Sequence, residues 1–556
     1  MRAMFRRRPR PLRALLVLTL GAVLLCLPFA AAKDGENLGF FLDWRPELEP
    51  LLLIAAVAVL SLRGRRLPAL LRWLVALILF VAALVQFAEA MVLAALDREL
   101  DLYFDLAHVP KLLALFYEAA GPWRGALALA GLALAAVAVV AAMALALGAI
   151  ERALTPARHA ALCAGVFLAA PLTSLAIDHL GLGQSLVGVR TLPAVINQMT
   201  LAYRAFAVTH GFDHRYDAVL DAAQPRPGAL PGLNGRDVIL VFFESYGTVA
   251  LDDPRYGASV APALGDFVAT VEKAGYHLRS NRLLSPTFGG GSWLAHGTID
   301  SGLKLDPLLT RLVLDSGRMT LARYMRAAGY RAVEVMPGLK SSEPEHEFWG
   351  FERSYYAADL GYDGPAFGWF DIPDQYTLRR FDAIEGAPAH APLFAQIVLV
   401  SSHTPFVPVP PYVEDWRDAS DYKSVTSQQW EHIYAPPDWA HLENAYAESI
   451  VYDLKTLAHW LATREGDGLV IILGDHQPPG FVSGEKQPWT VPIHVLSRDP
   501  ALLQTFAAQG YAAGALPPRA GAVKGMESFL GDFLSAFAVA PPVVATHPEA
   551  AEPPAE

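Results

Sequence analysis

Apolar residues are concentrated in the first third of the chain. Five apolar stretches occupy the first 180 residues, at about 11–32, 46–62, 68–92, 123–148 and 160–176. A membrane-spanning helix needs about 20 mostly apolar residues to cross about 30 Å of hydrocarbon, and four of the stretches supply nearly that or more. The second is short and has Glu49 at its entrance, so it is either a span or a buried or interfacial helix. The pattern predicts a membrane domain of about five helices over residues 1–180.

Basic residues between the stretches predict how the bundle is oriented. Lys and Arg accumulate on the cytoplasmic side of membrane segments. Six arginines precede or open the first stretch, RGRR stands at 63–66, and Arg152 and Arg158 flank the fourth connection. With five spans these basic ends alternate, and everything after about residue 177 lies outside the cytoplasm. The first stretch could instead be a signal peptide, whose cleavage leaves the later topology unchanged.

The rest of the chain divides into three parts. Residues 181–235 predict connector helices and a linker, because PRPGALPGLNG at 225–235 contains three prolines and three glycines and stops any helix. Residues 236–540 form the main exported domain. Residues 541–556 (PPVVATHPEAAEPPAE) predict a disordered tail.

In the exported domain, apolar runs alternate with helical patterns. RDVILVFFESYG (236–247), FAQIVLVSSH (394–403) and GLVIILGDH (468–476) are continuous apolar strands, and helical segments such as ENAYAESIVYDLKTLAHWLATRE separate them. Such strands, joined by helices, predict an α/β domain with a mainly parallel sheet covered by helices on both faces. In these sheets ligands gather beyond the carboxyl ends of the strands.

Composition adds two limits. The chain has a net charge of −11, and no basic cluster lies in the exported part, which argues against nucleic acid as a partner. The only cysteines, Cys26 and Cys163, lie in apolar stretches, so the exported domain has no disulfide of its own.

Three predicted strands end in residues suited to metal chemistry. The first delivers Glu244, the second His403, and the third Asp475 and His476. Each alone is most simply a turn or hydrogen-bonding residue. Together they place two carboxylates and two imidazoles at one edge of a sheet, where buried anions repel one another unless a cation lies between them. The pattern predicts a divalent metal site.

A glycine-rich segment supplies a hydroxyl. In SPTFGGGSWLAHGTIDSGL (285–303), three glycines allow close approach of the backbone, and SWLAHGTI has helical character. Ser292 then lies at or near a helix N-terminus, either as a simple cap or as a nucleophile whose attack on a negatively charged group the helix amides favour. Thr298 and Ser301 are competing hydroxyls, deeper in the helix.

The order of Glu244, the glycine-rich loop with Ser292, the SSHTPF segment around His403, and the GDH at 474–476 resembles the sulfatase-like branch of the alkaline phosphatase superfamily. The pattern is most similar to the lipoteichoic acid synthase and phosphoglycerol transferase group, which also has five membrane helices, a connector and an extracytoplasmic catalytic domain. The segment FWGFERSYYAADLGYDGPAFGWFD (348–371) is similar to that group's substrate-contacting stretch with Trp and Arg, although the spacing between Trp349 and Arg353 differs.

The resemblance implies a mechanism. Glu244, Ser292, Asp475 and His476 would hold one divalent ion, Mn, Mg or Zn, which lowers the pKa of the serine hydroxyl. Ser292 would attack a phosphodiester and keep the phosphoryl headgroup until an acceptor hydroxyl or water takes it. Substrate contacts would come from His403, Trp349 and Arg353. The expected reaction moves phosphoglycerol from phosphatidylglycerol to a glycan or polymer, at a bacterial inner membrane with the catalytic domain on its periplasmic side.

Two alternatives stay open. A phosphoethanolamine transferase or phosphodiester hydrolase of the same superfamily shares this site, although such ethanolamine enzymes typically carry several disulfide cysteines. A catalytically silent membrane scaffold or sensor is the alternative of another class. Lipoteichoic acid enzymes of the group present threonine where this chain has Ser292. Sulfatases need Cys or Ser followed by x-Pro-x-Arg, whereas Ser292 precedes Trp-Leu-Ala-His.

Overall fold

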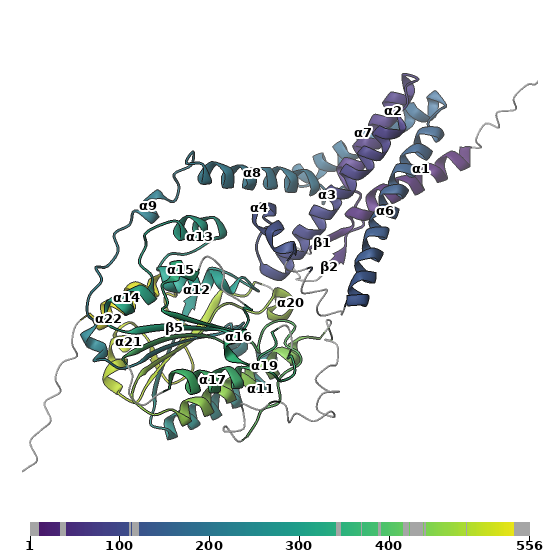
Figure 1. Ribbon diagram of the computed structural model, residues 1–556. Coiled ribbons are helices and arrows are strands. Elements are labelled where there is room, and N and C mark those ends of the chain that lie inside the picture. Colours follow the sequence, from purple (N-terminus) through teal and green to yellow (C-terminus); the bar gives the residue numbers. More distant parts are fainter. Residues whose placement is uncertain are drawn as a thin grey trace, which may run out of the picture. The chain divides into compact units, whose positions relative to one another are not determined.

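The computed structural model describes residues 11–33, 40–110, 113, 122–340, 346–367, 370–386, 391–414, 422, 438, 441–484 and 486–538. The chain divides into two compact units, Met1–His214 and Arg215–Glu556 (Figure 1). The division falls inside the segment 181–235 that the sequence predicts as a connector. The domain limits at 180, 235 and 540 stay predictions, and the tail 541–556 lies outside the described residues.

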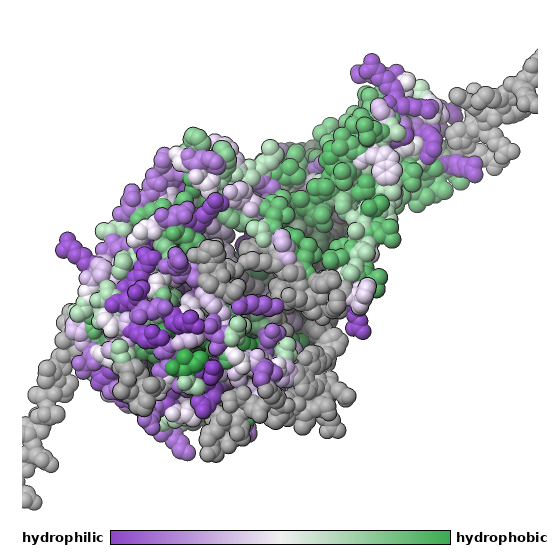
Figure 2. All heavy atoms as spheres, in the orientation of Figure 1, coloured by the Kyte–Doolittle hydropathy of each residue, from purple (hydrophilic) through white to green (hydrophobic). Residues whose placement is uncertain are grey.

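The first unit is helical. Its main elements are α1 (Pro11–Cys26), α2 (Leu48–Leu62), α3 (Ala69–Leu96), α4 (Leu102–Asp105), α6 (Pro122–Ala153), α7 (Ala157–His179) and α8 (Thr191–Thr209), with a small ladder of β1 (Ala31–Lys33) and β2 (Phe40–Leu42). Four described segments are long and apolar enough to cross a membrane: Leu12–Phe29, Ala69–Leu96, Trp123–Ala153 and Ala157–His179. Much of their surface is hydrophobic (Figure 2).

The second predicted stretch is the exception among the five. It forms α2, which has 15 residues, about 22 Å at 1.5 Å per residue, and so is shorter than the other candidate spans. Its residues Ile54, Val57 and Ala58 are buried in the apolar core of the first unit. Among the described residues, four segments are therefore long enough to span by themselves, and α2 packs mainly against α7. A fifth crossing by α2 stays a prediction.

The second unit is built on one large sheet. Its strands are β3 (Val238–Phe243), β4 (His277–Leu284), β5 (Arg331–Met336), β6 (Arg353–Tyr356), β7 (Leu393–Val398), β8 (Leu469–Gly474), β9 (Thr490–Ser497), β10 (Ala512–Ala513) and β11 (Lys524–Gly525). The spatial order is β10-β4-β9-β8-β3-β7-β5-β6, with β11 beside β4. The five strands from β8 to β6 are mutually parallel, and β9 is antiparallel to both neighbours.

Helices cover both faces of this sheet (Figure 1). The described α-helices of the second unit are α9 (Asp217–Leu220), α10 (Val249–Asp252), α11 (Pro254–Lys273), α12 (Ser292–Ser301), α13 (Pro307–Leu314), α14 (Leu321–Ala327), α15 (His346–Trp349), α16 (Ala357–Leu360), α17 (Asp374–Glu385), α19 (Glu443–Thr463), α20 (Gly480–Ser483), α21 (Gln504–Ala508) and α22 (Ser528–Phe537). Helices α11, α17 and α19 lie on one face, and α12, α14 and α22 on the other.

The sequence of β3 is apolar without alternation because both faces of the strand are buried. Ile239, Val241 and Phe243 are buried in the core under α11 and α19. Val238, Leu240 and Phe242 are buried in the opposite core, against α12, α14 and α22. Successive side chains of a strand point to opposite faces, so a strand covered on both sides must be apolar throughout. The predicted α/β fold with helices on both faces is confirmed.

Candidate metal centre and nucleophile

Two neighbouring strands deliver the metal-capable residues. Strands β3 and β8 are parallel, and Phe243 pairs with Gly474 at their carboxyl ends. The next residue of each strand is therefore Glu244 and Asp475, which emerge side by side, and His476 follows at once. A side chain at Gly474 would collide with the carbonyl oxygen of Tyr246, so only glycine fits at that position. The sheet register, rather than any local motif, brings Glu244 to the GDH sequence.

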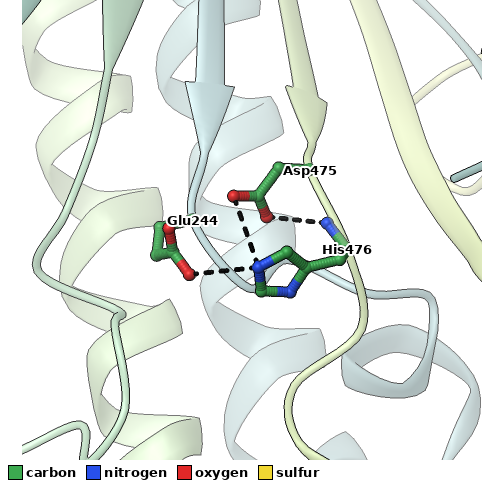
Figure 3. Close-up of side chains that lie close together, drawn as sticks. All are labelled: Glu244, Asp475 and His476. Carbon is green, nitrogen blue, oxygen red and sulfur yellow. Dashed lines mark hydrogen bonds and ion pairs between the residues drawn. The ribbon is translucent and has the colours of Figure 1, made fainter. Parts of the chain in front are cut away.

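Glu244, Asp475 and His476 form one buried cluster (Figure 3). One ligand atom from each lies within 4.8 Å of the others. The Nε2 atom of His476 is 3.5 Å from Oε1 of Glu244 and 3.7 Å from Oδ2 of Asp475. All three side chains are less than 4% exposed. These separations leave space for a cation between the three groups.

Hydrogen bonds fix the cluster from outside. The backbone N–H groups of Ser245 and His476 donate to Oδ1 of Asp475, at 2.8 and 2.7 Å. The ring of His476 donates from Nδ1 to the carbonyl oxygen of Gln477 at 2.7 Å, because a carbonyl can only accept. In the neutral ring, the Nε2 atom of His476 is therefore the acceptor, and it faces the two carboxylates. A metal-binding histidine usually has this arrangement.

The glycine-rich loop places Ser292 at the same point. Gly291, with φ of 77°, is the residue before α12, and Ser292 is its first residue. The Oγ atom of Ser292 is 3.1 Å from Oε2 of Glu244 and 3.1 Å from Nε2 of His476. The Gly289 N–H donates to the carbonyl oxygen of Gln477 at 3.0 Å, which holds the loop against the GDH segment.

The competing hydroxyls have structural partners instead. Thr298 Oγ1 accepts the N–H of Leu305 at 3.0 Å, and Ser301 Oγ donates to the carbonyl oxygen of Gly297 at 2.6 Å. Both residues are fully buried in α12. Ser292 is therefore the hydroxyl of this helix that contacts the cluster.

Burial and like charge act on the acids of the cluster. Burial, followed by the neighbouring charge of Glu244, raises the pKa of Asp475 to about 6. Burial alone would lower the pKa of His476, but the charges of Asp475 and Glu244 outweigh it and the pKa is raised. The charge of Glu244 thus adds to the effect of burial on Asp475, whereas for His476 the two carboxylate charges determine the direction of the shift.

The residues present fit a divalent metal. The Oδ2 atom of Asp475 is buried and has no hydrogen-bond partner in the described structure, which is costly for a carboxylate oxygen. Two carboxylates, one imidazole and one hydroxyl are oxygen-rich ligands with a single nitrogen, a set that suits Mn, Mg or Zn. Glu244, Asp475, His476 and Ser292 are the residues that would hold the ion.

His403 lies in the loop that follows β7. Its Nδ1 atom donates to the carbonyl oxygen of Thr404 at 2.7 Å, and its ring packs edge-on against Phe370. Burial lowers its pKa to about 4, and the nearby groups His476 and Asp475 also act on it. The loop is fixed to the cluster because the Ser402 hydroxyl donates to the carbonyl oxygen of Glu244 at 2.7 Å. His403 is therefore a neutral imidazole beside the cluster.

Trp349 lies beside α12 rather than in the cluster. It ends α15, and its ring packs so closely on Gly297 of α12 that a Cβ at that glycine would lie 2.8 Å from the indole. It also packs against the apolar cluster that contains Leu294 and Leu305. The structure therefore gives Trp349 a packing role against α12.

Arg353 does not reach the cluster, contrary to the role expected for it from the resemblance. It begins β6, and the register Arg353–Val333–Ala395–Ile239 places it level with Ile239 of β3. Ile239 precedes Glu244 by five positions, about 17 Å along a strand. The guanidinium is exposed and pairs with Asp359 at 2.7 Å. Arg353 lies near the amino ends of the parallel strands, because it is the first residue of β6, whereas the cluster lies beyond their carboxyl ends.

Two further residues near the site were not predicted from the sequence. His296 follows Ser292 by one helical turn, is 7% exposed, and stacks on Phe242 with ring centroids 4.0 Å apart. Its four-residue spacing from Ser292 is the only sequence signal. Asp374 begins α17 and accepts the N–H of Val400 at 2.8 Å and of Ser401 at 2.7 Å, which orders the loop carrying His403. No sequence signal links Asp374 to that loop.

No protein-family model and no curated protein sequence matches the chain. Solved structures do. The lipoteichoic acid synthase LtaP from Listeria monocytogenes has 17% identity and a TM-score of 0.38, covering 56% of this chain and 75% of that one. The C-terminal periplasmic domain of EptC from Escherichia coli has 15% identity and a TM-score of 0.36, and the match covers 56% of this chain and 84% of that one. The phosphoglycerol transferase GacH from Streptococcus pyogenes has 11% identity and a TM-score of 0.33, and the match covers 60% of this chain and 91% of that one.

These solved structures include a lipoteichoic acid synthase and a phosphoglycerol transferase, the two kinds of protein in the group named in the sequence analysis. These identities and TM-scores carry no conclusion about substrate or reaction. Those conclusions depend on the side chains of the site itself.

Proposed function

We propose that this protein is a membrane-bound, metal-dependent phosphotransferase that uses Ser292 as its nucleophile. Its proposed reaction transfers the phosphoglycerol headgroup of phosphatidylglycerol to a hydroxyl of a glycan or polymer. The observation that carries the proposal is the position of Ser292 Oγ, 3.1 Å from both Glu244 and His476, at the N-terminus of α12. A hydroxyl in simple capping use has no need of three buried metal-capable groups around it.

The metal, when bound, supplies positive charge that favours ionisation of the serine hydroxyl and of the phosphodiester oxygens. Glu244, Asp475 and His476 would hold it and orient it toward Ser292. The first N–H groups of α12 face a group attacked by Ser292, and the helix N-terminus favours its negative charge. The three glycines before Ser292 leave room for a phosphoryl group to approach.

The proposed chemistry has two displacement steps. In the first, Ser292 loses its proton, its Oγ forms a bond to phosphorus, and the bond from phosphorus to the diacylglycerol oxygen breaks; that oxygen takes up a proton. In the second, an acceptor hydroxyl loses its proton and its oxygen bonds to phosphorus. The bond between phosphorus and Oγ breaks, and Ser292 regains a proton. The covalent intermediate carries glycerophosphate on Ser292.

His403 is a neutral imidazole, which is the state that a proton acceptor needs in the second step. Since Nδ1 carries the hydrogen donated to Thr404, a neutral His403 presents Nε2 as an acceptor. An acceptor can receive the proton of an attacking hydroxyl, or a hydrogen bond from a headgroup hydroxyl. We assign His403 to the hydroxyl of the acceptor or of the headgroup.

Membrane attachment supports a lipid donor. Four helical segments of the chain have the length and composition of membrane spans. With α2 taken as a fifth crossing, the basic residues between the helices favour an exported second unit. This orientation corresponds to the periplasmic face of a bacterial inner membrane. Attachment to the bilayer keeps the site near its substrate and reduces the entropic cost of the encounter.

The test is to incubate the full-length protein with Mn²⁺ and either labelled phosphatidylglycerol or labelled phosphatidylethanolamine, and to identify the group on Ser292 by mass spectrometry. Glycerophosphate is the expected adduct. Ethanolamine phosphate would select the alternative donor. Ser292→Ala is expected to reduce headgroup turnover by at least about 1,000-fold with unchanged thermal stability. Turnover that survives this change would reject Ser292 as the nucleophile.

A further inference from the structure

The second unit exposes few large apolar side chains. Among its described residues they are Val219, Leu284, Trp293, Phe481, Leu516 and Val523. Three of the six, Leu284, Trp293 and Phe481, lie on the two segments that carry Ser292 and the Asp475–His476 pair. We call these three the apolar rim. Scattered exposed apolar residues need no explanation, but a group of them around a site indicates an interaction surface.

The two segments of the rim lie side by side. Leu284 ends β4, and Trp293 follows Ser292 directly. Phe481 is in α20, five residues after His476. The Ser285 hydroxyl donates to the carbonyl oxygen of Asp475 at 2.6 Å, and the Ser285 N–H to that of Trp489 at 2.8 Å. With the Gly289–Gln477 bond, these contacts join segments 284–293 and 475–489. The rim therefore borders the site on both of its loops.

Side chains of the rim are substantially exposed. Trp293 and Phe481 are each 42% exposed and Leu284 is 37% exposed, although Phe288 and Val482 beside them are buried. The exposure is thus selective, since the same loops bury their other apolar residues. Transfer of each exposed aromatic ring out of water would lower the free energy.

Basic residues stand next to Phe481. Arg255 donates from Nη2 to the carbonyl oxygen of Ser483 at 2.8 Å, which places it against α20, and it also pairs with Asp253. Lys486 is exposed on the same connection. Aromatic side chains flanked by Lys and Arg are typical of protein surfaces at the headgroup level of a bilayer, where anionic lipids attract the cations.

We infer that the apolar rim inserts Phe481 and Trp293 into the headgroup region of an anionic phospholipid bilayer. This inference rests on the proposed lipid donor. The membrane-length helices of the same chain hold the second unit at a bilayer, and a phospholipid phosphate lies at the bilayer surface. Insertion of the rim brings that phosphate to Ser292 without full extraction of the acyl chains. The rim is then the entrance for the donor, while water-soluble substrates do not need it.

The first experiment locates the rim without relying on activity. Because Cys26 and Cys163 are the only cysteines, a Cys26→Ser, Cys163→Ala background permits one labelled site at a time in the full-length protein. A nitroxide at Phe481→Cys, in vesicles of phosphatidylglycerol and phosphatidylcholine, is expected to collide with oxygen at least about threefold more, relative to a water-soluble nickel complex, than one at Glu465→Cys. Glu465 is exposed and precedes β8, at the opposite edge of the sheet.

Two outcomes of this experiment overturn the inference. A label at 481 that behaves like the label at 465 would place the rim in water. A label protected from both relaxing agents would mean that protein covers it, either the first unit or a partner.

The second experiment measures the function of the rim. Phe481→Ser is expected to reduce turnover of phosphatidylglycerol in vesicles about tenfold, equivalent to about 1.4 kcal/mol, while hydrolysis of bis(p-nitrophenyl) phosphate stays within twofold. Loss of both activities, or of neither, contradicts the inference. If the unmodified protein turns over no lipid, the proposed function fails, yet the label position is still informative about the rim.

Discussion

Replacing Asp475 by Asn is expected to stabilise the metal-free protein while it abolishes metal binding. The pKa of Asp475 is raised from 3.8 to about 6 by burial and by Glu244. Since the folded pKa exceeds the unfolded one, the group contributes stability at low pH that is lost as pH rises to about 6. At 1.36 kcal/mol per pKa unit, the loss is about 3 kcal/mol at pH 7.5.

Asparagine removes that loss with little change of contacts. Its Oδ1 atom can keep the two N–H bonds from Ser245 and His476. Its amide nitrogen takes the place of Oδ2, which has no hydrogen-bond partner. In the new position the nitrogen can donate toward Glu244 or Nε2 of His476. With a chelator at pH 7.5, Asp475→Asn should therefore unfold several degrees above the unmodified protein.

The assay is thermal unfolding of the full-length protein in detergent, followed by tryptophan fluorescence, with EDTA or with excess Mn²⁺. With EDTA the gain should shrink from about 3 kcal/mol at pH 7.5 to about 1 kcal/mol at pH 4.5, where most of the folded protein already carries a protonated Asp475. With Mn²⁺ the order should reverse, because only the unmodified protein binds the ion. Ser292→Ala, which changes no charge, is the control and should change metal-free stability by less than about 1 kcal/mol.

A gain that is absent at pH 7.5, or equal at both pH values, would refute the reasoning. The first result would mean that burial and the charge of Glu244 do not raise the pKa of Asp475 far above its ordinary value. The second would mean that the variant acts through packing rather than charge.

The remaining predictions concern the metal and the two substrate residues. Metal affinity, measured by calorimetry, should fall by about fourfold or more between pH 7.5 and 5.5, because protons compete for Asp475 and for His476, whose pKa is also raised; a constant affinity would exclude these residues as ligands. His403→Gln should slow transfer to a hydroxyl acceptor about 100-fold in a single-turnover assay while the adduct on Ser292 still forms, and equal slowing of both steps would contradict its assignment. Arg353→Ala should leave turnover within twofold, and a larger loss would place Arg353 at the site after all.

Much of the site could be predicted because strand ends are visible in a sequence. Glu244, Asp475 and His476 each follow a continuous apolar run, and parallel strands share one carboxyl edge. Ser292 was marked by its three glycines. The structure brings these four residues together, as the sequence pattern suggested, while the functional roles assigned to them remain proposals.

Other features could not be read in this way. Arg353 lies near Trp349 in the sequence, yet the strand it begins enters the sheet from the opposite edge. Trp349 contacts Gly297, a residue 52 positions earlier, through packing of α15 on α12. The apolar stretch at 46–62 has a composition suited to a membrane, but only the helix bounds separate it from the longer spans.

The sequence by itself determined which segments are apolar enough for a membrane, which are buried strands, and which reactive residues stand at strand ends, since these properties depend on neighbouring residues. Only the tertiary structure decided which strand ends are adjacent, which nitrogen of His403 and His476 carries hydrogen, and which apolar residues stay exposed around Ser292. These depend on sheet register, on carbonyl groups brought close by folding, and on packing between distant segments, and no local pattern encodes them.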